Sequence, residues 1–253
     1  MYTQQVPGVN HLGQPIGDPV PDWKPPPLPP HEAMPGGTCR LEPLDPARHA
    51  AQLFAAHERD GEYRNWTYLQ QGPYDTLDDY ARAIERAAAG DDPQFYAVVV
   101  GPRGSGGPDS HGVAAGVAAY LRMAPAAGSI EVGHIHFSPL LQRTPAATEA
   151  MFLMMRRAFD LGYRRYEWKC DALNASSRAA AQRLGLSFEG VFRQAAVYKG
   201  RNRDTAWYAA IDREWPALQA AFEEWLDPAN FAGDGRQRVR LSSLTAPLLA
   251  SRG

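Results

Sequence analysis

Residues 138–162, SPLLQRTPAATEAMFLMMRRAFDLG, change character at one point. A short apolar run gives way to Gln142, Arg143, Thr144 and Pro145, then to small residues, then to an amphipathic pattern with helical spacing. The pattern predicts a strand followed by a helix, with Thr144 as the N-cap. Pro145 then lies in the first turn, where its missing N–H removes no intrahelical hydrogen bond.

The start of this predicted helix is suited to an anion. We expect the amides of Ala146, Ala147 and Thr148 to be free donors at the positive end of the helix dipole. Small side chains let a diphosphate approach that main chain closely. An ordinary capped helix fits the same residues, so this stretch alone leaves a phosphate site open.

The composition argues against several classes of protein. A length of 253 residues suits one large domain or a domain with appendages, and a formal net charge of -2 does not indicate a nucleic-acid or membrane-surface partner. Cys39 and Cys170 are too few for a disulfide framework or a zinc site. No apolar run reaches transmembrane length, and the first residues lack the blocks of a signal peptide. These features predict a cytoplasmic protein.

Three segments are expected along the chain. Residues 1–37 are rich in proline and glycine, and PVPDWKPPPLPP lies at their centre. They predict an extended arm that wraps its own domain with Trp23 as an apolar anchor, and a partner that binds proline-rich segments is the alternative. Residues 38–228 form the domain, and residues 229–253 are expected to be a mobile or loosely docked tail.

Strand and helix patterns alternate within the domain. Strands are predicted at 39–44, 94–100, 112–123, 129–138 and 163–174, with a hairpin formed by 188–200 and 203–212 around the turn GRNR. Helices are predicted at 45–59, 76–89, 174–185 and 214–226, besides the one that follows Thr144. The loop GPRGSGGPDSH at 101–111 lacks the Gly-Lys-Ser/Thr ending of a P-loop and is expected to be a flexible connection. The alternation predicts a mixed α/β protein.

The strand at 129–138 carries polar groups on both faces. Strict alternation places Glu131, Gly133, Ile135 and Phe137 on one face, and His134 and His136 on the other. Two histidines at this spacing suit a metal site, but nothing nearby supplies the remaining ligands. A structural or pocket-lining role is therefore the prediction.

Four linked motifs resemble the GNAT (GCN5-related) N-acetyltransferase superfamily. Gln142 to Ala147 is similar to its Gln/Arg-x-x-Gly-x-Gly/Ala pyrophosphate loop, and Asn174 with Ser177 matches its Asn-x-x-Ser. RLGLSFEGVFR resembles its Leu-Gly-Phe-x-x-Glu-Gly passage, and RDTAWYAAIDREW resembles the hairpin return of the ribosomal-protein N-acetyltransferase branch. The resemblance covers roughly Arg40 to Leu226.

The resemblance implies a fold and an activity. The fold is a central mixed, mostly antiparallel twisted sheet with splayed middle strands, flanked by helices. The activity is transfer of acetyl from acetyl-CoA to a primary amine, in a protein N-terminus or a small molecule, by direct attack in a ternary complex. No metal, nucleic-acid partner or membrane partner is expected, and the chain is expected to be a monomer or homodimer. The implied donor contacts are the main chain of His136 and Phe137, then Gln142, Arg143, Thr144, Ala146, Ala147, Thr148, Asn174 and Ser177.

One departure from the family pattern concerns the loop. Pro145 and Ala147 replace its two glycines, and a proline donates no hydrogen bond. Side chains such as Arg143 are expected to compensate by offering charge to a phosphate. The departure supports an alternative, a non-catalytic acyl-CoA-binding regulatory module. A nucleotide-binding α/β domain is a third alternative, but the sequence has neither the glycine fingerprint nor the acidic ribose-binding residue of that class.

Catalytic candidates follow from the resemblance. Glu131, eleven residues before Gln142, is the expected base through a water, with Asp171, Glu189 and His134 as rivals. Ser177 is the expected acid for the departing thiolate. Tyr198 and Tyr208 are its reserves.

The acceptor is the least constrained partner. Residues 61–76 are expected to form part of its wall, with Trp66, Tyr68 and His134 as substrate-binding candidates. Asp75, Asp78 and Asp79 either favour a cationic amine or begin a helix. A protein N-terminus, an antibiotic-like amine and a polyamine all stay open.

Overall fold

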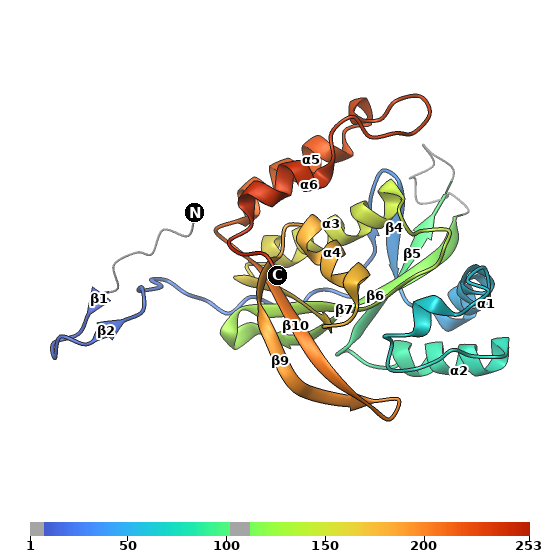
Figure 1. The fold of residues 1–253 in the computed structure, drawn as a ribbon, viewed down its shortest axis with the longest axis horizontal. Helices are drawn as coiled ribbons and strands as arrows, with labels where there is room; N and C mark the ends of the chain where they lie inside the picture. Colours follow the sequence, from blue (N-terminus) through green and yellow to red (C-terminus); the bar gives the residue numbers. More distant parts are fainter. Residues whose placement is uncertain (1–7, 102–111) are drawn as a thin grey trace.

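The structure of the protein is a computed structural model that describes residues 8–101 and 112–253. Its centre is an eight-stranded sheet (Figure 1). In spatial order the strands are β3 Met34–Pro35, β4 Cys39–Pro43, β5 Gln94–Val100, β6 Val113–Ala124, β7 Ser129–Phe137, β8 Arg165–Asp171, β10 Arg201–Ile211 and β9 Ser187–Tyr198. The predicted loop at 101–111 falls, apart from its first residue, outside the described part of the chain.

Strands β7 and β8 form the parallel pair of this otherwise antiparallel sheet. Their pairing runs from Ser129 opposite Arg165 to Val132 opposite Trp168, and it stops there although both strands continue. The expected mixed sheet with splayed middle strands is thereby confirmed.

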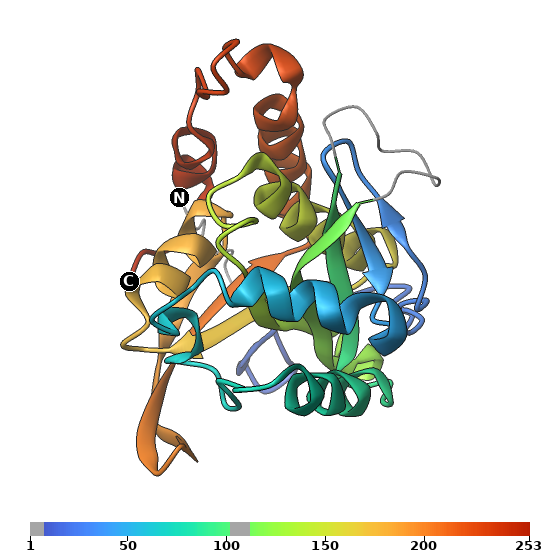
Figure 2. The ribbon, with the colours of Figure 1, turned by 90° about the vertical axis from the view of Figure 1, so that its right-hand side faces the viewer.

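Helices cover both faces of the sheet (Figures 1 and 2). The larger apolar core joins one face to α3 Pro145–Asp160, α4 Ala175–Arg183 and α5 Trp215–Leu226. The smaller core joins the other face, over β5 and β6, to α1 Pro46–His57 and α2 Leu77–Ala88. The second face of β7, β8, β10 and β9 carries the ion pairs of Glu131, Glu167 and Lys169 and the stacked rings of Trp207 and Phe192.

The predicted helix boundaries are confirmed by their caps. The side chains of Asp45, Thr76 and Thr144 accept from the amides of Ala47, Asp79 and Ala147. Gly185 follows α4 with φ +88, as expected of a helix C′ residue. The predicted turn GRNR is shorter than expected, because β10 already begins at Arg201.

The predicted alternation along β7 is wrong beyond Gly133. His136 pairs with Val117 and Gly133 with Ala119, so β7 has one more residue than β6 in this interval. This β-bulge contains His134 at φ +49 and reverses the alternation. Glu131 and His136 consequently share the face of α1 and α2, while Ile135 and Phe137 pack on the larger core.

The N-terminal arm docks from Trp23 onward. Trp23 lies under the Arg164 guanidinium, whose Cζ is 5.3 Å from the centroid of the Trp23 ring. Pro26 and Pro29 are buried. Arg157 donates to the carbonyls of Pro30, Glu32 and Ala33 at 3.2, 2.8 and 2.9 Å. Residues 8–22, with β1 Gly8–Val9 and β2 Pro15–Ile16, instead project away from the domain (Figure 1). The expectation of a docked arm therefore holds only from Trp23.

The C-terminal segment packs on the domain, which differs from the predicted mobile or loose tail. It contains α6 Leu241–Thr245 and the short 3-10 helices η3 Pro228–Asn230 and η4 Ala246–Leu248. Leu241 is fully buried, and the amide of Ala250 donates to the Ser187 hydroxyl at 2.9 Å. Leucines at helical spacing supply the apolar contact. No helix among the described residues has the length and apolar character needed to cross a membrane.

Candidate active site

The candidate site is the gap where β7 and β8 part. Residues 134–137 border it on β7 and residues 169–171 on β8. Beyond Val132 the edge of β7 that faces β8 has no pairing partner on that strand. A carbonyl inserted between the strands would find its hydrogen-bond donors there, as the resemblance implies for His136 and Phe137.

The turn after β7 leads into the amino end of α3. Thr144 caps this helix by accepting from the Ala147 amide at 3.2 Å, so the expectation that this amide is free is wrong. The hydroxyl of Thr148 accepts from Arg183 at 3.0 Å. Arg143, at φ +61, is exposed beside the turn. Small side chains, a helix dipole and the nearby Arg143 and Arg183 fit the diphosphate of a CoA donor. The Ala146 amide could donate to it directly, whereas the Ala147 amide could do so only in place of its hydrogen bond to Thr144.

The α1–α2 loop, residues 58–76, is tied to the borders of the gap. Gln142 Nε2 donates to the carbonyl of Phe137 and to Asn65 Oδ1, both at 2.8 Å. On the β8 side, the Tyr68 hydroxyl donates to the carbonyl of Leu173 at 3.1 Å. From the β9–β10 hairpin, Lys199 Nζ donates to the carbonyl of Trp66 at 2.8 Å. Three elements distant in sequence thus hold this loop beside the gap, where the sequence places the acceptor wall.

Trp66 covers a pair of histidines. Its ring centroid lies 4.1 Å from that of His136, which stacks on His57 at 3.6 Å with an interplanar angle of 4°. Both histidines are buried, and Nδ1 and Nε2 of His57 and Nε2 of His136 have no hydrogen-bond partner among the residues that the structure describes. Burial lowers the pKa of His57 to about 4 and places the pKa of His136 well below its ordinary value. Both rings are therefore neutral near pH 7.

A pH dependence of stability follows from His57. Its folded pKa, about 4, lies below the ordinary 6.5, so between these values the unfolded state binds more protons. The free energy of unfolding should therefore fall as the pH drops from 6.5 to 4, and His57 accounts for about 3 kcal/mol of that fall. His57→Phe, which retains a ring but cannot titrate, should flatten the decline in urea unfolding measured across this range. An unchanged slope would contradict the assignment.

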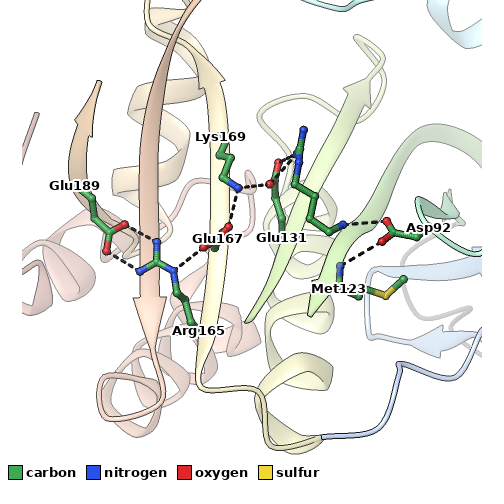
Figure 3. A network of polar contacts seen from close by, with 8 residues as sticks. Asp92, Met123, Glu131, Arg165, Glu167, Lys169 and Glu189 are labelled. Atoms are coloured by element: carbon green, nitrogen blue, oxygen red, sulfur yellow. Dashed lines mark hydrogen bonds and ion pairs between the residues drawn. The ribbon is translucent and has the colours of Figure 1, made fainter. Parts of the chain in front are cut away.

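Glu131 belongs to a chain of ion pairs on the face of the sheet that also carries α1 and α2, which we call the acceptor side (Figure 3). Its carboxylate contacts Arg122 Nη1 at 2.8 Å and Lys169 Nζ at 2.7 Å. The chain continues from Lys169 to Glu167, then to Arg165 and Glu189. Glu131 is buried, and the rival Glu189 binds Arg165. The proposed base is thus held between two cations.

The residues at the end of β8 form two small hydrogen-bonded groups. Asn174 caps α4 by accepting from the Ser177 amide at 3.0 Å, and the Ser177 hydroxyl accepts from Trp168 Nε1 at 2.9 Å. Asp171 accepts from the Tyr198 hydroxyl and from the amide of Leu173, both at 2.8 Å. Burial and the Asp171 carboxylate raise the pKa of Tyr198 to about 12. Tyr208 is fully buried, and its hydroxyl accepts from Arg178.

His134 lies on the acceptor side of the bulge, with its ring 5.1 Å from that of Phe95. Desolvation of the imidazole, followed by the positive charges of Arg122 and Arg203, lowers the pKa of His134. Its imidazole is therefore mainly neutral near pH 7 and can accept a proton.

The aspartates after the α1–α2 loop begin α2. Asp79 accepts from the Thr76 hydroxyl and contacts Arg82, and Asp78 shares the first turn. They are exposed helix-start residues, which is the second of the two interpretations of their sequence pattern. Among the described residues, no group of three or more His, Cys, Asp or Glu side chains is placed to hold a metal ion.

Sequence reasoning missed three residues around the gap. His57 follows Leu53 by four residues in α1, and this helical spacing could have placed it on the buried face. Lys199 and Arg203 were assigned to the hairpin and its turn without a role. For Arg203, the period-two pattern with Thr205 and Trp207 was the available signal.

The comparisons with known proteins agree with this geometry. The family model described as acetyltransferase (GNAT) domain matches residues 39–187. The crystal structure of a GCN5-related N-acetyltransferase from Brucella melitensis is 44% identical, covers 90% of this chain and 100% of its own, and has a TM-score of 0.84. A protein from Chromobacterium violaceum, described as a probable acetyltransferase of the GNAT family, is 41% identical over 81% of this chain and 98% of its own, with a TM-score of 0.72.

More distant structures share the fold alone. An acetyl transferase from Salmonella typhimurium modifies the N-terminal serine of the 50S ribosomal subunit protein L7/L12. It is 20% identical, covers 71% of this chain and 99% of its own, and has a TM-score of 0.56. No curated protein matches the chain.

Proposed function

The chain belongs to the GNAT acetyltransferase family, and from that premise we propose that it transfers the acetyl group of acetyl-CoA to a primary amine by direct attack. Acetyl-CoA supplies an acetyl thioester, whose carbonyl carbon is the electrophile. The gap between β7 and β8, with a bulge on one border and the amino end of α3 behind it, carries the proposal. A protein N-terminus and a small-molecule amine are both acceptors of this class.

Residues along β7 and α3 would hold the donor. The main chain of His136 and Phe137 faces the thioester and pantetheine, and Asn174 offers its amide group. The diphosphate would lie at the start of α3, against Gln142, Arg143, Thr144, Ala146, Ala147 and Thr148. Pro145 has no N–H to donate to the diphosphate, and the positive charge of Arg143 compensates for the missing hydrogen bond.

Two proton transfers complete the proposed reaction. The attacking amine must be neutral, and Glu131 removes its proton through a water molecule. Because Glu131 contacts Arg122 and Lys169, one of these ion pairs must loosen for it to act. Ser177 donates a proton to the departing sulfur while Trp168 orients its hydroxyl, and water returns a proton to Ser177 as the proton taken up by Glu131 is released to water. His134, neutral and on the same side, is the rival base. Trp66 and Tyr68 bound the acceptor.

An amine screen tests the proposed transfer. The purified chain is mixed with acetyl-CoA and a panel of primary amines and peptides, and free thiol is measured. We expect amine-dependent thiol release well above the slow hydrolysis seen without an amine, together with the acetylated amine by mass spectrometry. Saturable donor binding without thiol release for any amine would instead favour an acyl-CoA-binding module.

A further inference from the structure

Arg203 presents an unpaired guanidinium near the open end of the gap. The side chain is half-buried, and its buried Nε has no hydrogen-bond partner in the described part of the chain. Within the described residues it forms no ion pair, and its contact is with the ring of Tyr198, 5.9 Å from the guanidinium carbon. Guanidinium is permanently charged and only donates hydrogen bonds. A partly desolvated cation of this kind is stabilised when a ligand brings an anion.

The strand register places Arg203 just beyond the end of β8, at the open end of the gap. Thr205 pairs with Asp171, the last residue of β8. Arg203, two residues earlier in β10, therefore lies on the same face, about 7 Å beyond the end of β8. Tyr198 links the two, because its hydroxyl donates to Asp171 at 2.8 Å while its ring lies under Arg203.

Neighbouring carboxylates do not neutralise this cation. The three glutamates of the ion-pair chain are matched by Arg122, Lys169 and Arg165. Asp171 is held by Tyr198 and Leu173. Asp204 is occupied by the Gln194 amide and by Asn202 at 2.7 and 3.0 Å. The positive charge of Arg203 is therefore available to a ligand.

A second donor on the same face also lacks an acceptor. Trp207 follows Arg203 by four residues in β10, so both side chains share a face of the strand. Trp207 Nε1 is buried and has no hydrogen-bond partner within residues 8–101 and 112–253, and Lys169 Nζ lies 3.8 Å from the centroid of the Trp207 ring. Indole nitrogen and guanidinium both donate only. A ligand on this face is thus expected to supply oxygen acceptors.

We infer that Arg203 binds a carboxylate of the acceptor, so that the enzyme prefers amines that carry a carboxylate in the same molecule. The inference rests on the proposed acetyl transfer and names its acceptor class. The carboxylate belongs either to an acidic side chain of a peptide or to a free carboxyl terminus. Asp78 and Asp79 do not oppose it, because they lie in the exposed first turn of α2, where Asp79 pairs with Arg82.

Three dipeptides that share an N-terminal alanine test the preference. They are Ala-Gln amide without a carboxylate, Ala-Glu amide with a side-chain carboxylate, and Ala-Gln with a free carboxyl terminus. At least one carboxylate peptide should show a kcat/KM about tenfold or more above that of Ala-Gln amide, the effect of one charge-assisted hydrogen bond. The better of the two identifies the source of the carboxylate.

Variants then assign the preference to Arg203. In Arg203→Gln the ratio between carboxylate and amide peptides should fall to about one, whereas Arg203→Lys should keep part of it. Arg201→Gln is the matched control, since it removes the same charge from an exposed side chain two residues earlier. It should leave the ratio unchanged. Melting curves show whether each variant is folded.

Binding of the acetylated products separates this inference from the transfer itself. In the presence of CoA, calorimetry should show the N-acetylated form of the preferred carboxylate dipeptide binding about tenfold more tightly than N-acetyl-Ala-Gln amide, and only when Arg203 is present. Equal turnover and equal binding of all peptides would overturn the carboxylate site while leaving acetyl transfer intact. Product selectivity without any thiol release would contradict the transfer but support the site. An Arg203→Gln effect confined to the KM of acetyl-CoA would also overturn the inference.

Discussion

Ala147→Glu is expected to abolish the rise in melting temperature that acetyl-CoA gives the unmodified protein. At a hundredfold excess over its dissociation constant, a ligand that binds only the folded state stabilises it by about 2.7 kcal/mol. The glutamate side chain would project at the start of α3, block the approach of the diphosphate and repel its charge. The measurement is a pair of melting curves with and without the donor.

Ala47→Glu is the matched control for this change. Ala47 is exposed in the first turn of α1, which like α3 has a proline at its first position. A carboxylate there suits the helix dipole and should leave the donor-induced shift intact. If Ala147→Glu retains the full shift, the diphosphate lies elsewhere. If the unmodified protein shows no shift with saturating donor, the donor assignment itself is wrong.

Glu131→Gln is expected to impair both turnover and stability. Loss of a general base lowers the rate by roughly a hundredfold or more, with donor affinity nearly unchanged. Lys169, almost buried, also loses one of its two carboxylate partners, so the free energy of unfolding should fall by about 3 kcal/mol. Amine-dependent thiol release between pH 6 and 9 and urea unfolding measure the two effects separately.

Glu167→Gln separates the base from the ion-pair chain. Glu167 contacts the same Lys169 at 2.8 Å and pairs directly with Glu131 across β7 and β8, but it is not the expected base. It should lose comparable stability but keep most of the turnover. Equal loss of turnover in both variants would mean that the intact chain, and not the Glu131 carboxylate, is required. Full turnover in Glu131→Gln would direct attention to His134.

Ser177→Ala should slow the reaction less than Glu131→Gln does, because water can replace the serine hydroxyl.

Local signals in the sequence were sufficient for the long helices and strands of the domain and for the mixed α/β class, but not for β1, β2, β3 or α6. Caps such as Thr76 and Thr144, and the glycine after α4, act within one turn of chain, so their residue types specify the boundary. The bulge at His134 was missed because one extra residue leaves no mark in composition. Every face assignment beyond it was consequently reversed.

Long-range contacts explain what the sequence did not disclose about the site. Pairing of Glu131 with Arg122 and Lys169 depends on three strands meeting in register. Stacking of His57 on His136 joins a helix to a strand 79 residues later in the chain. Packing of the C-terminal leucines was hidden by the polar residues between α5 and α6. The period of a single segment carries no information about such partners.

The three ties of the α1–α2 loop have a consequence for the order of folding. They join residues separated by 77, 105 and 133 positions, so the entropy of closing long loops must be met before any of them forms. The loop should therefore settle only once the sheet is complete and both β8 and the β9–β10 hairpin are in place. During refolding, helical signal should return before catalytic competence. Amides of residues 58–76 should likewise exchange with solvent through local openings that leave the core strands protected.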